Sequence, residues 1–246
     1  MQILYYEFFG FEHFTDIFDA LFYTASMRIN KYLASCGIAS RRGAEELILA
    51  RRVTLNGKVI TELAMQILDG DVVKVDGKVV SPETRKVYVI MNKPRGVVTT
   101  CSDDRGRKTV IDLMRQIRNE TNEANLGSIR VFPVGRLDYD TEGLLILTND
   151  GDLAREITHP SSEISKVYIA TVDTKVTDEH LCDIVSKIGD NTVQVTIHEG
   201  KNRQVRKMLA AVGLNVTDLK RVAIGNLTLG KLKPGEFICT NTKPRI

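Results

Sequence analysis

Three carboxylates spaced two residues apart are the feature of this sequence with the clearest chemical potential. They are Asp138, Asp140 and Glu142, and they lie between the apolar stretches 131–137 and 144–147. These stretches have the length and composition of strands, so we expect the acids on the loop that joins them. A loop fixed by two strands is a common place for binding and catalytic residues.

Three interpretations of this loop differ in their chemistry. The first is a calcium loop, because acids at the first, third and fifth positions followed by Gly143 match the EF-hand pattern. That pattern also requires a Glu at its twelfth position, where this chain has Asn149, and helices on both sides. The second is a polar surface turn, which composition alone does not exclude. The third is a catalytic carboxylate that stabilises positive charge on the anomeric carbon of a sugar.

Three further side chains could complete a carboxylate site. Arg206, on a predicted helix, could keep Asp138 ionised in a pocket, where desolvation opposes the charge. Tyr168, in a predicted strand, could stack on a base. Arg136 could fill the space that a displaced base leaves, or hold a phosphate. Taken singly, the arginines could equally be solvated and the tyrosine could belong to the core.

A family signature covers the acidic loop. Residues 135–151 read Gly-Arg-Leu-Asp-Tyr-Asp-Thr-Glu-Gly-Leu-Leu-Ile-Leu-Thr-Asn-Asp-Gly. This segment resembles the signature of the RsuA/RluB/RluE/RluF family of ribosomal RNA pseudouridine synthases. In that family the Asp of Arg-Leu-Asp is catalytic, so the resemblance implies this role for Asp138 and a structural role for Asp140. Four more segments resemble family motifs, in the family's order: Asn92–Gly96, His159–Tyr168, Glu199–Met208 and Leu219–Glu236.

These segments carry the other implied site residues. The active-site tyrosine of the family aligns with Tyr168, and its active-site arginine aligns with Arg206. The resemblance covers residues 27–246, and the stretch 105–109 is closest to the RluB branch. Together with Arg136, four residues of the matched segments are candidates for substrate binding: Lys166, Asn202, Arg203 and Gln204.

The implied reaction sets its own requirements. Pseudouridine formation breaks the bond between ribose and a uracil nitrogen, turns the base and rejoins it through carbon. It needs no redox step, group donor or metal ion, so we expect no cofactor and no metal site. It does need an ionised carboxylate beside the sugar and a base that has left the helical stack.

Residues 27–80 form a region with a pattern of its own. Two short amphipathic helices are predicted at 30–36 and 41–50, the second capped by Ser40, and Asn-Gly at 56–57 predicts a hairpin. The pattern resembles an αL RNA-binding motif named after a small-subunit ribosomal protein. Five basic residues are candidates for contacts with phosphates: Arg41, Arg42, Arg51, Arg52 and Lys58.

The expected architecture is α+β, with this small RNA-binding domain followed by a pseudouridine synthase domain on a mixed, mainly antiparallel sheet. Strands and helices do not alternate regularly, which argues against a doubly wound sheet. The expected organisation is an extension of unknown role at 1–26, the RNA-binding domain at 27–80, a linker at 81–86 and the catalytic domain at 87–246. Helices are predicted near 109–117, 151–157, 177–187 and 203–212. Strands are predicted near 87–91, 97–100, 144–148, 167–172, 193–197, 222–228 and 236–239.

One connection departs from the family pattern. Only residues 188–192 join the predicted helix 177–187 to the strand at 193–198, where the family has a longer stretch. We expect either the loss of a peripheral hairpin or an omitted loop. In both cases one rim of the RNA cleft has an altered shape.

Charge and composition agree with a nucleic-acid partner. All 34 Lys and Arg residues follow residue 26, whereas four of the 31 acids precede it, so residues 27–246 carry a net charge of +7. No stretch reaches the ~20 apolar residues that a membrane span requires. The cysteines and histidines are scattered, so we expect no zinc site. The expected protein is a cytoplasmic monomer whose partner is ribosomal RNA.

The stretch 105–109 favours a uridine of large-subunit ribosomal RNA as the target, and a small-subunit target is the alternative within the same enzyme class. A non-catalytic, ribosome-associated RNA-binding protein would share the basic surface, but it would not need Asp138, Tyr168 and Arg206 together. A glycosidase could use two of the clustered acids as its acid pair. The absence of Trp as a sugar platform and the basic region 27–80 argue against a glycosidase.

Overall fold

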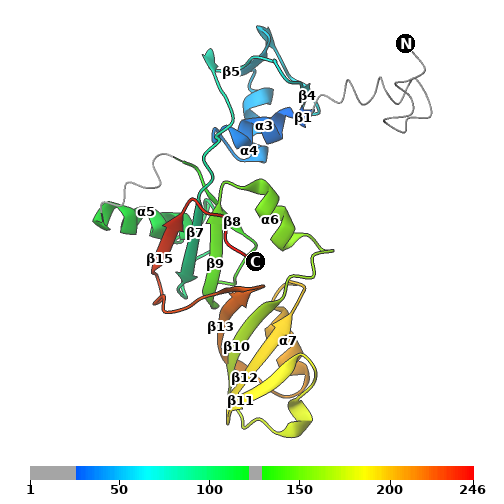
Figure 1. Ribbon diagram of the computed structural model, residues 1–246, viewed down its shortest axis with the longest axis vertical. Coiled ribbons are helices and arrows are strands. Elements are labelled where there is room, and N and C mark those ends of the chain that lie inside the picture. Colours follow the sequence, from blue (N-terminus) through cyan, green and yellow to red (C-terminus); the bar gives the residue numbers. More distant parts are fainter. Residues whose placement is uncertain (1–25, 122–128) are drawn as a thin grey trace, which may run out of the picture. The chain divides into compact units, whose positions relative to one another are not determined.

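The computed structural model describes residues 26–121 and 129–246, so the predicted extension 1–26 lies outside the described residues except for Ser26. The chain divides into two compact units, the first ending at Thr84 and the second comprising Arg85–Ile246. Both contain helices and strands, which confirms the expected α+β class (Figure 1). No helix in the described part of the chain is long and apolar enough to cross a membrane.

The first unit packs two helices beside short antiparallel strands. A four-stranded sheet has the order β3-β2-β5-β6, and β1 pairs with β4. The elements are β1 (Met27–Arg28), α3 (Ile29–Ser35), α4 (Arg41–Leu49), β2 (Val53–Leu55), β3 (Lys58–Val59), β4 (Gln66–Ile67), β5 (Val73–Val75) and β6 (Lys78–Val79).

Local sequence explains this unit. The Ser40 hydroxyl accepts a hydrogen bond of 3.0 Å from the Gly43 amide, which confirms the predicted cap of α4. Asn56 and Gly57 both have positive φ angles, of 50° and 82°, as the tight hairpin between β2 and β3 requires. The apolar faces of the two helices pack into its core, and four helix side chains are fully buried there: Ile29, Leu33, Ala44 and Ile48.

The second unit is built on a single nine-stranded sheet. Its central order is β11-β12-β10-β13-β9-β7-β15, with β14 beside β13 and β8 beside β9. Only β13 and β9 pair in parallel among the described strands, so the predicted mixed, mainly antiparallel sheet is confirmed. The strands are β7 (Tyr88–Lys93), β8 (Phe132–Val134), β9 (Glu142–Thr148), β10 (Lys166–Val172), β11 (Val185–Gly189), β12 (Thr192–Ile197), β13 (Val216–Ile224), β14 (Leu227–Thr228) and β15 (Phe237–Thr240).

Helices cover both faces of the central strands. Alternate residues of β9 divide between two cores: Leu145 and Leu147 face one, and Leu144 and Ile146 face the other. The first core includes α5 (Val110–Thr121) and α7 (Gln204–Ala211), and the second includes α6 (Gly151–Thr158). Because both faces are covered, β9 reads as a nearly continuous apolar run.

A close backbone approach joins the two halves of this sheet. Gly143 of β9 pairs with Arg221 of β13 and has a φ of +120°. A Cβ atom at position 143 would lie 2.2 Å from the Arg221 carbonyl oxygen. Glycine is therefore required where the loop carrying the acids enters the sheet.

Three predicted elements of this unit, one helix and two strands, are wrong. Residues 177–187 do not form a helix: a short 3-10 turn, Asp178–His180, leads into strand β11. Val185 of β11 pairs with Val195 of β12 and is buried, so sheet pairing prevails over the helical pattern. The short connection 188–192 contains the end of β11, the hairpin turn at Asp190 and Asn191, and the start of β12.

The other error concerns two strands. The predicted strand 222–228 is in fact β13, which begins at Val216, a turn and then β14. In the predicted strand 97–100, only Val98 forms an isolated bridge, with Thr109.

Candidate active site

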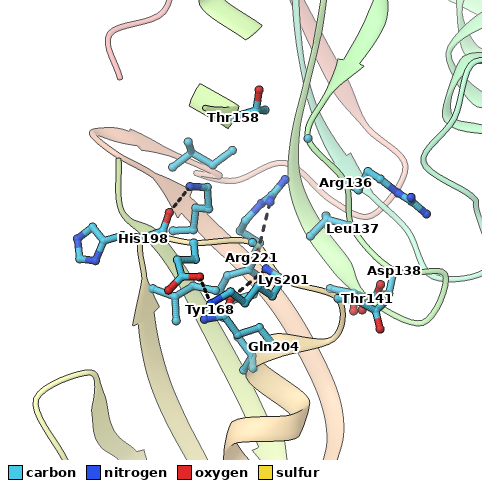
Figure 2. A pocket seen from close by; sticks show the side chains of 18 of the residues that line it. Arg136, Leu137, Asp138, Thr141, Thr158, Tyr168, His198, Lys201, Gln204 and Arg221 are labelled. Carbon is cyan, nitrogen blue, oxygen red and sulfur yellow. Dashed lines mark hydrogen bonds and ion pairs between the residues drawn. The ribbon is translucent and has the colours of Figure 1, made fainter. Parts of the chain in front are cut away.

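A cavity of about 610 Å³ opens in the second unit. Its walls come from the loop after β8, the end of α6, strands β10 and β13, and the connection between β12 and α7. Figure 2 shows Tyr168 and Arg221 together in one part of the cavity, with Asp138 and Thr141 in another. Seven of the predicted site residues line it: Arg136, Asp138, Lys166, Tyr168, Asn202, Arg203 and Gln204.

The backbone of Asp138 is fixed from two sides. Its carbonyl oxygen accepts hydrogen bonds from the Thr141 amide and from Lys93 Nζ, both at 3.1 Å. The hydroxyl of Thr99 donates to the preceding Leu137 carbonyl at 2.8 Å. These contacts leave the half-buried carboxylate of Asp138 at the cavity wall.

A fully buried lysine organises this loop. Besides Asp138, Lys93 Nζ donates to the Pro94 and Thr141 carbonyls, at 2.9 Å each. Burial lowers the pKa of Lys93 to about 8, although the nearby charges of Asp138 and Asp140 oppose that shift. Lys93 lies in the matched segment Asn92–Gly96, but the sequence predicted no role for it.

The three clustered acids face different partners. Asp140 pairs with Arg203 and Arg206, and Glu142 pairs with Lys220 at 2.7 Å. No group of three or more Asp, Glu, His or Cys residues in the described ranges is placed to hold a metal ion. The loop is followed by strand β9 instead of a helix. The loop therefore lacks the flanking helix that the EF-hand pattern requires.

The contacts of Arg206 differ from the prediction. It was expected to pair with Asp138, but Nη2 donates to the Asp140 carbonyl at 3.0 Å and lies 3.3 Å from its carboxylate. Nη1 donates to the Val216 carbonyl at 3.0 Å. Arg206 is mostly buried and does not line the cavity. It ties the acidic loop to β13 and interacts with Asp138 only through the proximity of their charges, without a hydrogen bond between the two side chains.

Arg203 holds the same acid from the solvent side. It caps α7 in the left-handed conformation, with φ at 51°, and its guanidinium donates to both carboxylate oxygens of Asp140, at 3.1 and 3.0 Å. Burial raises the pKa of Asp140, but the hydrogen bond from Arg203 and the charges of both arginines outweigh it and keep that pKa below its usual range. A strained non-glycine residue beside a cavity is a common feature of functional sites.

Tyr168 lies on β10 and Arg221 lies directly opposite on β13. Both are buried, and Arg221 Nη1 lies 3.5 Å from the Tyr168 hydroxyl. Arg221 Nε donates to the Leu144 carbonyl at 2.8 Å. Arg221 was not predicted as a site residue, because the predicted strand began one residue later, at 222. Its place in the matched segment Leu219–Glu236 was the available signal.

The remaining predicted site residues differ in how they face the cavity. Arg136 is exposed, and Figure 2 shows its side chain directed away from Tyr168 and Arg221. Lys166 Nζ donates to the Ile164 and His198 carbonyls, at 3.1 and 2.8 Å. The Gln204 side chain accepts from the Lys201 amide and supports its own loop. Asn202 is exposed at the rim.

Comparison with known proteins assigns this site to a family. Residues 87–211 match the family model described as RNA pseudouridylate synthase. The chain belongs to that family. It is a pseudouridine synthase, an isomerase, and the cavity with its acidic loop lies in the matched domain. Residues 27–73 match the S4 domain, which confirms the predicted RNA-binding motif.

Relatives align with most of this pseudouridine synthase. An RNA pseudouridine synthase of Aquifex aeolicus is 45% identical over 86% of this chain and 89% of its own length. Ribosomal large subunit pseudouridine synthase B of Bacillus subtilis is 40% identical over 85% and 90%. The dual-specificity RNA pseudouridine synthase RluF of Escherichia coli is 36% identical over 87% and 75%. A crystal structure of a pseudouridylate synthase has a TM-score of 0.58 at 27% identity, covering 87% of this chain and 96% of that one.

The S4 domain of the enzyme presents its predicted basic residues to solvent. Arg41 and Arg42, in the first turn of α4, are both exposed, and so are Arg51 and Lys58. Arg52 differs because its guanidinium donates to both oxygens of Asp76, at 2.8 and 2.6 Å. Four of the five predicted phosphate contacts are therefore exposed cations with no ion pair among the residues that the structure describes.

The roles of Arg206 and Arg203 can be separated by substitution. We expect Arg206→Gln to lower kcat by about 10²-fold, because loss of the buried link to Asp140 and Val216 lets the acidic loop shift. Arg203→Gln should lower kcat less, because this arginine is largely exposed and salt bridges of that kind contribute about 0 to 1 kcal/mol. Single-turnover rates and RNA affinities of both variants test this. Equal losses would mean that burial of Arg206 has no special importance.

Proposed function

We propose that this enzyme isomerises a specific uridine of large-subunit ribosomal RNA, with Asp138 as the catalytic carboxylate. The observation that carries the proposal is the placement of Asp138 and Tyr168 in the wall of one cavity, with Asp138 on a loop anchored by Lys93. The relative from Bacillus subtilis, which is named a large-subunit synthase, and the RluB-like stretch 105–109 support the choice of RNA.

The chemistry assigns a task to each group. The carboxylate of Asp138 faces the anomeric carbon and stabilises or traps the positive charge left there when the bond to the base breaks. Tyr168 offers its ring to the uracil after the base has left the stack. Lys93 and Arg206 hold the loop that carries Asp138, so that the carboxylate meets the sugar without rearrangement.

The proposed organisation divides the work between two domains. Residues 27–80 grip the RNA backbone, 81–86 form a linker, and 87–246 carry out the isomerisation. The exposed cations of the S4 domain support contacts with phosphates, because an exposed arginine in the first turn of a helix gains nothing from the helix dipole.

Removal of two free cations tests this division. We expect Arg41→Ala combined with Arg42→Ala to weaken RNA binding and to reduce the slope of log affinity against log salt by about one unit for each lost contact. The modified uridine should stay the same, because the base is bound in the other domain. Binding measured across a salt series, together with mapping of the product, provides the check.

Arg52→Ala is the matched control, because it removes a charge from the same domain but from an arginine already paired with Asp76. It should change the salt slope less than either free arginine does. An unchanged slope in the double variant would mean that the basic residues are only solvated. A change of the modified uridine would show that the S4 domain reads sequence or shape.

A small-subunit target is the second candidate. Incubation of the purified full-length enzyme with large-subunit and small-subunit ribosomal RNA transcripts, followed by mapping of pseudouridine, distinguishes the two. We expect modification of one uridine in the large-subunit transcript. Modification of the small-subunit transcript alone would overturn the proposed target while leaving the assigned chemistry intact.

A further inference from the structure

Arg221 is buried in the cavity wall with one of its nitrogens unpartnered. Its Nε donates to the Leu144 carbonyl, and Nη1 has only a long contact with the Tyr168 hydroxyl. Nη2 is buried and has no hydrogen-bond partner in the part of the chain that the structure describes. A buried charged donor without an acceptor is costly. Such an arrangement is reasonable where the acceptor arrives with the substrate.

The surroundings of Arg221 carry an excess of positive charge. Its two hydrogen bonds go to an uncharged carbonyl and an uncharged hydroxyl. Lys166 lines the same cavity, and burial together with the charge of Arg221 lowers the pKa of Lys166. This part of the cavity is therefore suited to a ligand atom that carries or gains negative charge.

We propose that Arg221 binds a carbonyl oxygen of the target uracil through Nη2 and stabilises the negative charge that the base acquires when it leaves the sugar. The inference rests on the proposed function, in which the base stacks on Tyr168. Arg221 is directly opposite Tyr168 on the neighbouring strand, and its guanidinium carbon lies over the Tyr168 ring, 6.0 Å from the ring centre. A base that packs against this ring therefore comes next to the guanidinium. The burial of Arg221 favours a small carbonyl oxygen over a hydrated phosphate.

The electron balance of the reaction explains why such a donor accelerates it. When the bond between C1′ and N1 breaks, both bonding electrons leave with uracil and spread over N1 and the carbonyl oxygens O2 and O4. A hydrogen bond to one of these oxygens strengthens as that charge grows, so it stabilises the transition state more than the bound substrate. When C5 then bonds to C1′, the C5 proton is lost to water and N1 takes up a proton. Arg221 transfers no proton, because guanidinium stays charged.

The position of Arg221 is set before the RNA binds. Its backbone is fixed between β10 and β9, and the hydrogen bond of 2.8 Å to Leu144 fixes one edge of the guanidinium. The free-energy cost of removing this guanidinium from water is incurred during folding, before the RNA binds. The hydrogen bond to the base therefore forms with little reorganisation, which is how fixed donors are most effective in catalysis.

The test measures coupling between Arg221 and single atoms of the base. Wild type, Arg221→Gln and Arg221→Lys react in single turnover with a short RNA that contains the mapped uridine, or 2-thiouridine or 4-thiouridine at that position. Sulfur is a weak hydrogen-bond acceptor. We expect Arg221→Gln to slow the unmodified RNA by about 10²-fold to 10³-fold with little loss of affinity. In the wild type, one of the two thio substitutions should slow the reaction about tenfold more than the same substitution does in the Arg221 variants. The position of that sulfur identifies the bound oxygen as O2 or O4.

Arg206→Gln is the matched control. It slows the reaction through the acidic loop, so it should keep the full effect of the thio substitution. If the thio effects are the same with and without Arg221, the proposal is overturned. It is also overturned if Arg221→Gln mainly lowers RNA affinity and reduces the salt slope by about one unit, which would identify a phosphate contact. If neither Arg221 variant folds, as judged by circular dichroism, the wild type alone decides: equal rates with uridine, 2-thiouridine and 4-thiouridine overturn the proposal.

Failure of this proposal can be distinguished from failure of the proposed function. If Asp138→Asn reacts as fast as the wild type, the assigned role of Asp138 fails, yet the coupling between Arg221 and the carbonyl can still be measured. If Asp138→Asn is inactive but no coupling to Arg221 is found, only the role of Arg221 is lost.

Discussion

Asp138→Asn should abolish pseudouridine formation, with a loss of about 10⁴-fold or more in the single-turnover rate. The amide keeps the shape of the carboxylate but removes the charge that must face the anomeric carbon. The contacts that hold this residue use its backbone carbonyl, which donors from Thr141 and Lys93 bind, so the fold should be unaffected. Affinity for the RNA should stay near the wild-type value.

Asp190→Asn is a suitable control for this change. Asp190 is an exposed carboxylate in the turn between β11 and β12, outside the cavity, and lies 3.9 Å from Lys187 Nζ. Its rate should match the wild type. Turnover of the Asp138→Asn variant within about tenfold of the wild type, a barrier difference of about 1.4 kcal/mol, would rule out an essential carboxylate at this position.

The largest effect on stability is expected at Gly143. In Gly143→Ala the new Cβ would meet the Arg221 carbonyl oxygen at 2.2 Å and its amide nitrogen at 2.5 Å, and both are backbone atoms. Relief requires separation of β9 from β13, which are joined at only two residue pairs. We expect the free energy of unfolding to fall by about 4 kcal/mol or more. Chemical denaturation followed by circular dichroism measures the loss.

Gly230→Ala separates the clash from the backbone strain. Gly230 also has a positive φ, of 61°, but an added Cβ would meet no atom within 4 Å. This change should cost only the strain of the left-handed conformation, about 1 to 2 kcal/mol. If Gly143→Ala were no less stable than Gly230→Ala, the two strands would not be in close contact at that point.

Asp138 and Tyr168 could be predicted as site residues because they lie in segments that resemble family motifs. The structure places both in the wall of one cavity. The mainly antiparallel sheet and the helix caps were also predictable, because they depend on local patterns of apolar residues and on side chains such as Ser40.

What the sequence could not provide was pairing over long distances. Arg206 approaches Asp140 and not Asp138 because α7, the acidic loop and β13 converge, which no local pattern encodes. Arg221 becomes a neighbour of Tyr168 only through the register of β10 with β13. The segment 177–187 has helical spacing, yet pairing of Val185 with Val195 makes part of it a strand.

Mapping of pseudouridine in ribosomal RNA from living cells tests the central claim most directly. Cells that lack the gene are compared with the same cells supplied with the wild-type gene or with Asp138→Asn. We predict that one pseudouridine of the large-subunit RNA disappears with the gene, returns with the wild type and stays absent with the variant. Return of that pseudouridine with Asp138→Asn, or its persistence in cells without the gene, would contradict the account.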